Sequence, residues 1–408
     1  MTTTLISFLG RAPKGENGYR KTLYRFPDGI QTEPLAFFGW ALHRRLSPGR
    51  VAILGTAGSM WDHLFEGDIA LGDALEAERL ALIESVNRQH VEQSQLDELA
   101  PALAQALGCA VSLVVIPYAR DHAEQVSILQ AIAEQVGDGD RVHLDVTHGF
   151  RHLPMLALLA ALHLRLARQA KIDGIWYGAF DPDTGDAPVH QLSGLLHIAD
   201  GVQALATFDK DGDYGVFEPL LRDAGLQEDA RQALRKAAYY ENILNVGAAT
   251  GELRRVRQML DTATLKPEGQ LLLPAIEKRL AWLDEDRQFE KQTRLARQAF
   301  ARSDYLRATL YAFEATISRL CQIERVPIDD FDKREEVRKN YETRLKQDRT
   351  DEREAYFLLK NLRNQVAHGT RGSVGEVQQA LLNQSVMREK LADLIGRIER
   401  GQLPAPPA

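Results

Sequence analysis

Arg363, Asn364 and His368 stand close together near the end of the chain, and their side chains could cleave RNA. A histidine takes up and releases protons near neutral pH, because its unperturbed pKa is about 6.5. An arginine grips phosphate oxygens with a planar fork of N–H donors. In RNA the ribose 2′-hydroxyl attacks the neighbouring phosphorus, so the nucleophile belongs to the substrate and no metal ion is required. We therefore predict His368 as general acid or base, Arg363 as phosphate ligand, and Asn364 as a residue that orients the histidine or the substrate.

The helix that must carry these residues is predicted over 352–367, with Gly369 as its C-terminal stop. Asn364 and His368 are four residues apart and share a face of this helix. Arg363 and His368 are five apart, which at about 3.6 residues per turn separates them by roughly 140°. Arg363 must use its length, or a partner chain must complete the site. The pattern alone is weak, because a histidine near a helix end is more often a surface or capping residue.

A second group of ligand-capable residues follows a strand predicted over 141–146. Thr147 offers a hydroxyl, His148 a donor or acceptor, and Gly149 an accessible N–H. Ligands of open parallel sheets bind beyond the carboxyl ends of the strands, and the N-terminus of the next helix favours a phosphate. Asp145 is expected to hydrogen-bond loop amides rather than the ligand. The segment predicts a phosphate or nucleotide site without a Walker lysine motif or a full Gly-x-Gly-x-x-Gly fingerprint.

Two more loops end predicted strands in the same way, after 5–9 and after 51–54. Small residues there would let a ligand approach the backbone, although Gly55 and Gly58 could equally serve a tight turn. Lys14 and Lys21 could add positive charge. The residues predicted to bind the ligand are Gly10, Arg11, Thr56, Ala57, Ser59, Thr147, His148, Gly149 and Arg151.

Strands and helices alternate in the first half of the chain, which predicts a mostly parallel, Rossmann-like sheet with helices on both faces. The apolar run 111–116 is typical of a strand buried on both sides, and 189–192 could pair back as a hairpin. The predicted strands are 5–9, 51–54, 111–116, 141–146 and 174–180, and the predicted helices are 34–45, 122–135 and 154–167, with a helix-rich insertion at 69–107. From about Gly201 onward only helical periodicity remains.

Composition places the chain among soluble globular proteins of two or three domains. It has 408 residues, of which 44% are hydrophobic and 26% charged, and its formal net charge is −7. That charge disfavours a broad basic face for coating DNA, so no stable DNA complex is expected. Two distant cysteines argue against a disulfide framework and a cysteine-based zinc site. With neither a signal peptide nor an apolar run of about 18 residues, we expect a cytoplasmic protein without membrane contact.

The segment Asp145–Gly149, with Phe150–Pro154 after it, resembles the DxTHG signature of CRISPR-associated proteins that carry a CARF sensor domain. The opening run Leu5–Gly10, followed by Tyr19 and Tyr24, is similar to the same family's first strand and loop. This resemblance covers roughly the first half of the chain. It implies a dimeric sensor for cyclic oligoadenylate, the second messenger of type III CRISPR systems, held across a two-fold axis by the strand-end loops of both subunits.

The string Arg363–His368 resembles the R-x4–6-H motif of HEPN ribonucleases, and the stretch 296–315 looks like that family's early helices. CARF and HEPN domains are known to occur together, so each resemblance strengthens the other. Two HEPN domains pair in that family so that both motifs line one cleft, which implies an active dimer and an inactive monomer. The expected domains are a CARF domain over 1–200, a helical connector over 201–287 and a HEPN domain over 288–402.

The two resemblances together imply an endoribonuclease of antiviral defence that cyclic oligoadenylate activates and that cleaves single-stranded RNA, leaving a 2′,3′-cyclic phosphate. No cofactor and no metal ligand set are expected, and the protein would form a homodimer or a higher homo-oligomer. Cyclic tetra-adenylate is the first candidate activator, although ring size, RNA preference and the role of the connector stay open. One alternative is a non-catalytic sensor that docks an effector. Another is a sensor that degrades its own ligand with Thr147 and His148.

Overall fold

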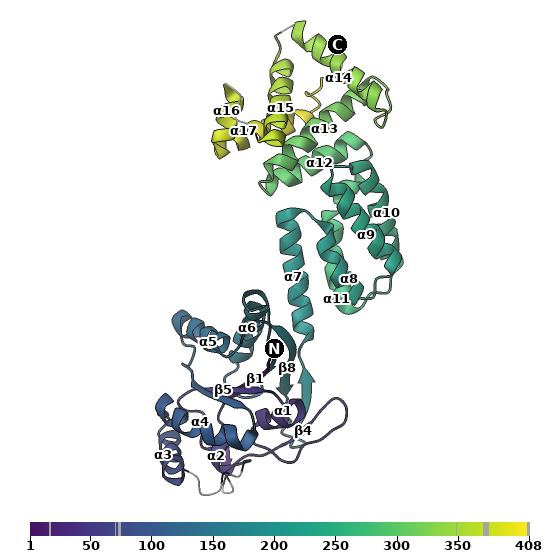
Figure 1. The fold of residues 1–408 in the computed structure, drawn as a ribbon. Helices are drawn as coiled ribbons and strands as arrows, with labels where there is room; N and C mark the ends of the chain where they lie inside the picture. Colours follow the sequence, from purple (N-terminus) through teal and green to yellow (C-terminus); the bar gives the residue numbers. More distant parts are fainter. Residues whose placement is uncertain (16–17, 70, 72–74, 348, 370–374, 406–408) are drawn as a thin grey trace. The chain divides into compact units, whose positions relative to one another are not determined.

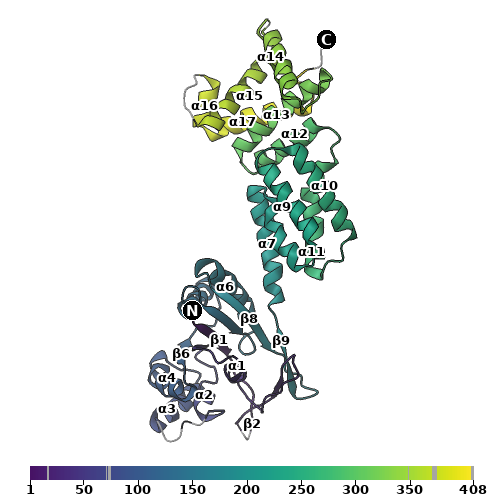
Figure 2. The same ribbon diagram turned by 45° about the vertical axis from the view of Figure 1, so that its right-hand side comes forward.

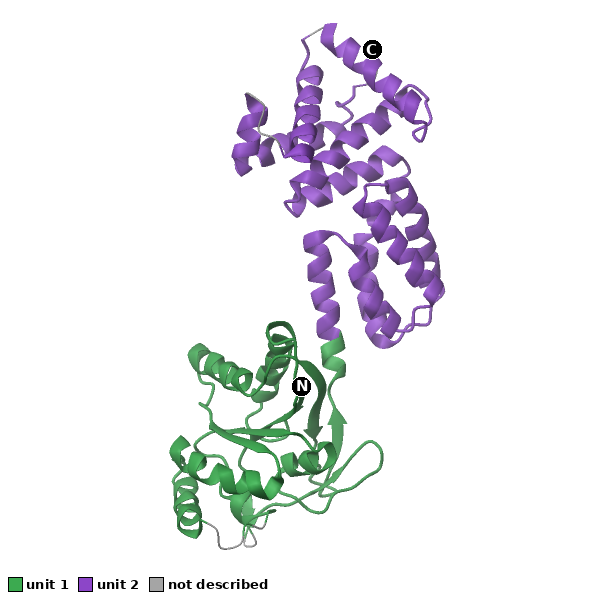
Figure 3. Cartoon of the chain, viewed as in Figure 1, with its two compact units in different colours: residues 1–197 green, residues 198–408 purple. Residues whose placement is uncertain are grey.

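The computed structural model describes residues 1–408 except 16–17, 70, 72–74, 348, 370–374 and 406–408. It divides into two compact units, Met1–His197 and Ile198–Ala408, which Figure 3 shows in different colours. The expected boundary at 200/201 lies close to this division, while the separation of a connector from a HEPN domain within the second unit stays a prediction.

A mostly parallel sheet forms the centre of the first unit (Figure 1). In the described residues its order is β4-β9-β8-β7-β1-β5-β6, and only the β8–β9 pair is antiparallel. This arrangement confirms the predicted α/β class and the hairpin. The strands are β1 (Thr3–Leu9), β4 (Leu23–Arg25), β5 (Arg50–Gly55), β6 (Ala110–Val115), β7 (Arg141–Asp145), β8 (Lys171–Gly178) and β9 (Asp186–Gln191), with a separate β2–β3 ribbon at Lys14–Gly15 and Gly18–Tyr19.

Both faces of the sheet are covered at β1, whose side chains alternate between two hydrophobic layers. Leu5 and Leu9 belong to one layer, and Ile6 and Phe8 to the other. Helix α1 (Phe38–Leu46) and helix α4 (Gln93–Leu107) contribute to the first layer, and α5 (His122–Glu134) and α6 (Leu153–Ala167) to the second. The short α2 (His63–Glu66) and α3 (Glu76–Asn87) complete the first layer. Strand β1 is therefore an inner strand, paired with β7 on one side and β5 on the other.

Strand β6 corrects one expectation. Its near-continuous apolar run predicted a strand buried on both faces, but the structure places β6 at the edge of the sheet. Only Leu113 of this strand is buried, with α4 packed against it. An apolar run indicates that a strand tends to be buried. It does not indicate where the strand lies within the sheet, because pairing with distant strands decides that position. The predicted helix 34–45 likewise begins only at Phe38, because Leu35 pairs with Thr22 in a β-bridge.

The second unit is helical throughout its described residues, as predicted, and Figure 2 shows α12 and α13 side by side. One hydrophobic core contains residues from both sides of position 287. None of the described helices is long and apolar enough to cross a membrane. The helices are α7 (Gly194–Asp211), α8 (Glu218–Asp223), α9 (Glu228–Asn242), α10 (Val246–Thr262), α11 (Pro267–Arg279), α12 (Gln288–Ala301), α13 (Tyr305–Ile323), α14 (Phe331–Gln347), α15 (Asp351–His368), α16 (Glu376–Leu382) and α17 (Gln384–Glu399).

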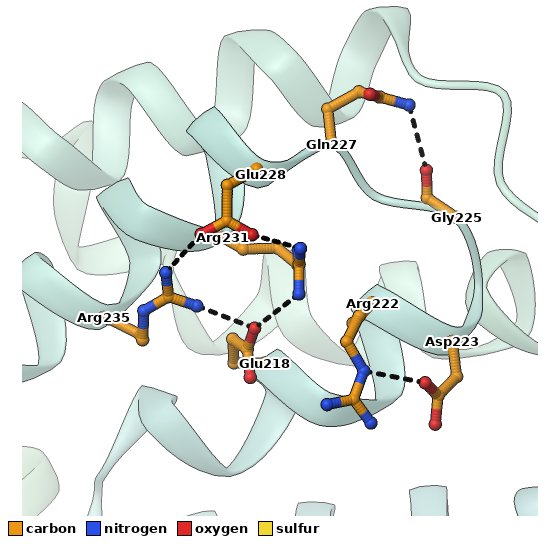
Figure 4. Close-up of polar contacts among 8 residues, drawn as sticks. All are labelled: Glu218, Arg222, Asp223, Gly225, Gln227, Glu228, Arg231 and Arg235. Carbon is orange, nitrogen blue, oxygen red and sulfur yellow. Dashed lines mark hydrogen bonds and ion pairs between the residues drawn. The ribbon is translucent and has the colours of Figure 1, made fainter.

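An ion-pair network joins α8 to α9 (Figure 4). Glu218 accepts hydrogen bonds from Arg231 at 3.1 Å and from Arg235 at 2.8 Å, and Glu228 also pairs with both arginines. Glu228 lies in the first turn of α9, where a negative charge is favourable to the helix dipole. The charges of Arg231 and Arg235 are therefore balanced locally, and these two arginines do not form an unpaired basic face.

A buried polar contact holds the first turn after α7 against the core. The indole Nε1 of Trp282 donates a hydrogen bond of 2.8 Å to the hydroxyl of Tyr214, and each side chain is 1% exposed. A buried N–H without an acceptor is costly, so this hydroxyl satisfies the indole as well as filling space.

Replacing Tyr214 with phenylalanine should lower the free energy of unfolding by about 1–3 kcal/mol, because the Trp282 N–H would lose its buried acceptor. Urea denaturation followed by tryptophan fluorescence measures this change. Tyr239→Phe is the matched control, since Tyr239 is 61% exposed, and its effect should stay within about 0.5 kcal/mol. Equal stability of the two variants would contradict the role assigned to Tyr214.

Candidate functional site

A cavity of about 290 Å³ lies at the carboxyl ends of β1, β5 and β7 in the first unit. Five of the nine predicted ligand residues line it, and no carboxylate is among its described lining residues. The absence of a lining carboxylate makes the cavity compatible with an anionic ligand. The residues that line it are Leu9, Gly10, Arg11, Thr56, Gly58, Ser59, Gln89, Tyr118, Gly149, Phe150 and Leu153.

The floor of this cavity is a contact of backbone against backbone. A Cβ placed on Gly10 would lie 2.4 Å from the amide nitrogen of Gly149, so the loops after β1 and β7 touch without side chains between them. Gly149 also has a φ of +101°, a conformation that residues with a side chain rarely adopt. A ligand entering the cavity therefore meets exposed backbone at this point.

The loop after β5 is tied to the same floor by hydroxyl groups. Ser59 Oγ donates to the carbonyl of Leu9 at 2.6 Å and accepts from the amide of Thr56 at 2.9 Å. Ser59 and Thr56 are 3% and 5% exposed, so these predicted ligand residues chiefly hold the wall in shape. Gly55 is required for packing, because an added Cβ would lie 2.8 Å from the Trp61 ring.

Asp145 is fully buried beneath the floor and acts on the loop, as expected from the sequence. Its carboxylate accepts the hydroxyl hydrogen of Ser7 and, at 2.9 Å, the amide hydrogen of Thr147. Removal from water raises the pKa of Asp145 to about 6, against the opposing effect of these two hydrogen bonds. Asp145 therefore orients the segment that leads to Gly149.

Four predicted ligand residues do not line the cavity: Ala57, Thr147, His148 and Arg151. Thr147 Oγ1 accepts a hydrogen bond from the amide of Gly178 at 2.9 Å. His148 Nε2 accepts from the amide of Phe38 at 3.1 Å. Burial lowers the pKa of His148 to about 4, which keeps the imidazole neutral and able to accept. Both side chains are thus engaged inside the domain, and neither is among the residues that meet the cavity.

Three side chains that the sequence did not single out line the cavity instead. Tyr118 follows β6, Phe150 follows Gly149, and Gln89 follows α3. The positions of Tyr118 and Phe150 after strand ends were a usable signal, because such loops meet at one edge of a parallel sheet. Nothing in the sequence placed Gln89 beside them, since it belongs to the insertion between β5 and β6.

A second cavity of about 470 Å³ lies in the helical unit between α13, α14 and α15. It contains Arg363 and Asn364, two of the three predicted catalytic residues. Its other lining residues are Phe313, Glu314, Ile317, Phe331, Arg334, Glu335, Arg338 and Lys360. Arg363, the residue predicted to bind phosphate, therefore lies in a cavity with several other cations.

Those other cations are neutralised by carboxylates. Arg334 pairs with Glu314, and Arg338 pairs with Glu335 and, at 2.6 Å, with Glu342. Lys360 Nζ lies 2.7 Å from Glu342. These pairs leave little unbalanced charge on the three cations.

Arg363 differs from them, because it forms no ion pair within the described residues. Its Nη1 donates to Asn364 Oδ1 at 3.1 Å, and its guanidinium lies 5.4 Å from the centre of the Phe313 ring. Its Nε is buried without a hydrogen-bond partner. A buried donor without an acceptor is costly, so the fold leaves this guanidinium only partly satisfied.

His368 is the last residue of α15 and is exposed. It does not line the cavity that holds Arg363 and Asn364. Gly369 ends the helix with a φ of +64° and donates its N–H to the carbonyl of Gln365, as the sequence predicted for the stop. One chain therefore does not place the histidine in the cavity of the arginine.

Comparison with known proteins bears on the first unit above all. Residues 4–181 match the family model described as "CRISPR system endoribonuclease Csx1, CARF domain". The chain is also similar to "CRISPR-associated protein MJ1674" of Methanocaldococcus jannaschii, with 25% identity over 417 residues. That alignment covers 92% of this chain, and the chain spans 63% of the length of the relative. The matches support a CRISPR-associated protein with a CARF-type first unit.

Gly10→Ala should lower the free energy of unfolding by about 1–3 kcal/mol, because its methyl group would push the Gly149 loop away. Gly15→Ala is the control, since a Cβ there would meet nothing within 4 Å. Chemical denaturation of both variants measures the difference. A Gly10→Ala variant as stable as Gly15→Ala would show that the two loops do not touch.

Asp145 should make stability depend on pH. Its folded pKa of about 6 lies above the ordinary 3.8, so between these values the folded protein holds a proton that the unfolded chain has lost. The stabilisation is fully present below pH 3.8 and is lost as the pH rises through about 6. Asp145→Asn should remove this fall in the free energy of unfolding, whereas the control Asp138→Asn, at a side chain 79% exposed, should retain it. Urea titrations across this pH range decide, and identical pH profiles of the wild type and Asp145→Asn would refute the assignment.

Proposed function

We propose that this chain is an endoribonuclease of type III CRISPR defence, activated by cyclic oligoadenylate and acting on single-stranded RNA without a metal ion. The first unit would be the sensor and the helical unit a HEPN-type nuclease. The observation that carries the nuclease proposal is Arg363, a cavity-lining cation with a buried unpaired Nε and no carboxylate partner in the described residues.

The sensor part is supported by the CARF match and by the cavity at the strand ends. The exposed backbone of Gly149, the cation of Arg11 and the N-terminus of α6 together suit a phosphate group. A cyclic oligonucleotide would extend beyond the 290 Å³ of one cavity, so the ring would be shared with the cavity of a second chain.

In the nuclease part, Arg363 would hold a phosphoryl oxygen of the scissile phosphate with its Nε–H and Nη–H groups. Asn364 would orient this guanidinium, because the Asn364 Oδ1 accepts a hydrogen bond from Nη1 of Arg363. His368 would take the proton from the attacking 2′-hydroxyl or return one to the departing 5′-oxygen. Because His368 lies outside the cavity of its own chain, the partner's copy of the helix would complete the site.

Activation follows from population shift in this proposal. Cyclic oligoadenylate would bind more tightly to the dimer arrangement in which the arginine of one chain faces the histidine of the other. Without the ligand that arrangement would be rarely populated, and an isolated monomer would be inactive. The ligand then needs no contact with the nuclease site.

A cleavage assay on single-stranded RNA tests the proposal, with and without cyclic tetra- and hexa-adenylate and with a chelator present. Ligand-stimulated cutting should leave 2′,3′-cyclic phosphate ends. His368→Ala and Arg363→Ala should each lower the rate by at least ~100-fold, because each removes a group that acts in the transition state. Arg353→Ala on the same helix is the control and should cut normally.

Two other results would contradict this assignment. Ligand binding without cutting under any condition would favour a non-catalytic sensor. Stimulated cutting that survives His368→Ala would place the nuclease site elsewhere. Linear products of the ligand, sought in the same reactions by mass spectrometry, would reveal degradation of the activator by the sensor.

A further inference from the structure

The cavity that holds Arg363 has two phenylalanines in its lining, and they differ in what they contact. Phe313 is 7% exposed, and the centre of its ring lies 5.4 Å from the Arg363 guanidinium. Phe331 is 76% exposed and is not among the described residues that form or pack against the hydrophobic core of the second unit. The fold therefore buries one aromatic ring of this cavity and leaves the other open to solvent.

The start of helix α14 fixes the position of Phe331, which is the first residue of this helix. The Asp330 side chain accepts the backbone N–H of Lys333 at 3.1 Å, and the Asp330 carbonyl accepts that of Arg334 at 2.9 Å. Asp330 therefore acts as the N-cap residue of α14 and holds its first turn. Arg334 and Arg338, three and seven residues after Phe331, lie on the same face of the helix and line the same cavity. The exposed ring thus belongs to the cavity face of α14.

The charges of the cavity separate a surface for an uncharged group from a site for an anion. Arg334, one helical turn from Phe331, forms an ion pair with Glu314, which also lines the cavity. Arg363 forms no ion pair within the described residues, and its Nε has no hydrogen-bond partner there. A phosphate is therefore attracted to Arg363, whereas the neutralised surface beside Phe331 suits an uncharged, flat group.

A nucleobase is such a group, and RNA presents one next to every phosphate. Every base has a π-face, so stacking on an aromatic ring does not depend on the sequence of the strand. In a duplex both faces of a base are covered by its neighbours, so a base must be unpaired to lie on the ring. The cavity volume of about 470 Å³ also falls within the range of about 300–1,000 Å³ that is typical of small-ligand sites.

We propose that Phe331 forms a base subsite of the nuclease cavity, where its ring stacks an unpaired base of single-stranded RNA next to the phosphate held by Arg363. The proposal rests on the nuclease function proposed above and adds the residue that binds the base beside the scissile bond. The base keeps this contact throughout the reaction, so Phe331 contributes to substrate binding and not to the chemical step. Phe331 differs in this respect from Arg363 and His368, which act on the reacting groups.

The experiment uses the full-length chain, cyclic tetra- or hexa-adenylate as activator, and a 2′-O-methylated RNA strand that keeps a single 2′-hydroxyl. Cutting can then occur at one phosphate only. Phe331→Ala should raise KM by about 5- to 150-fold, the range for one base stacked on an aromatic ring, and change kcat by less than about 3-fold. Phe331→Trp should keep the wild-type KM. Phe331→Leu, which is apolar but has no flat ring, should resemble Phe331→Ala.

A second series removes the base instead of the ring. Separate strands carry an abasic residue on one side or the other of the single 2′-hydroxyl. At one of these two positions the wild type should lose about 5- to 150-fold in kcat/KM. Phe331→Ala should lose little more at that position, because the ring and the base contribute only through each other. Equal losses in the two proteins at both positions would show that Phe331 does not contact the base.

Tyr239→Ala is the control and should keep the wild-type KM, because this ring is 61% exposed but is not among the residues that line the nuclease cavity. Melting curves show that each variant is folded, and sedimentation compares the oligomeric state of Phe331→Ala with that of the wild type. If Phe331→Ala keeps its KM or changes the oligomeric state, the base subsite is wrong while the nuclease function stands. If the wild type cuts no RNA under any condition, the nuclease function fails and the subsite fails with it.

Discussion

The strand-end site depends on one close contact, the approach of the Gly10 backbone to the amide of Gly149. Strand β1 lies between β5 and β7, so the loops that follow these three strands must share one small space. The buried carboxylate of Asp145 and the hydroxyl of Ser59 hold the neighbouring loops in register with this contact. A larger side chain at either glycine would separate the loops and change the cavity, which is why its floor consists of backbone.

The polar residues of the molecule fall into two groups with different uses. Ser59, Asp145, Thr147 and His148 form their hydrogen bonds inside the first unit, where they stabilise loops. In the helical unit, Glu342 and its neighbouring carboxylates similarly occupy the cations of α14 and α15. Arg363 differs from the other cations of its cavity, because it has no ion pair within the described residues and its buried Nε has no acceptor. A polar group near a cavity is a candidate for ligand binding only when the fold has not already satisfied it.

The same reasoning explains the separation of Arg363 and His368. The helix that carries both is an ordinary α-helix with a glycine stop, and five residues turn them to different sides. Arg363 is held against Phe313 in its cavity, while His368 is exposed at the helix end. In the proposed nuclease, a site that needs both groups at one phosphate would therefore be formed by two chains. The exposed histidine and the unsatisfied arginine are the two halves that such a site would bring together.

The sequence by itself determined the class of each half, the hairpin, the stop of helix α15 and the loop role of Asp145. These features depend on local periodicity, on glycine and on the preferences of short polar side chains, which neighbouring residues largely decide. Only the tertiary structure decided that β6 lies at a sheet edge, that Thr147 and His148 are engaged internally, and that Gln89 borders the cavity. Each of these features depends on partners distant in sequence, Gly178 and Phe38 among them. A local sequence pattern does not indicate which distant backbone group will form a hydrogen bond with a given side chain.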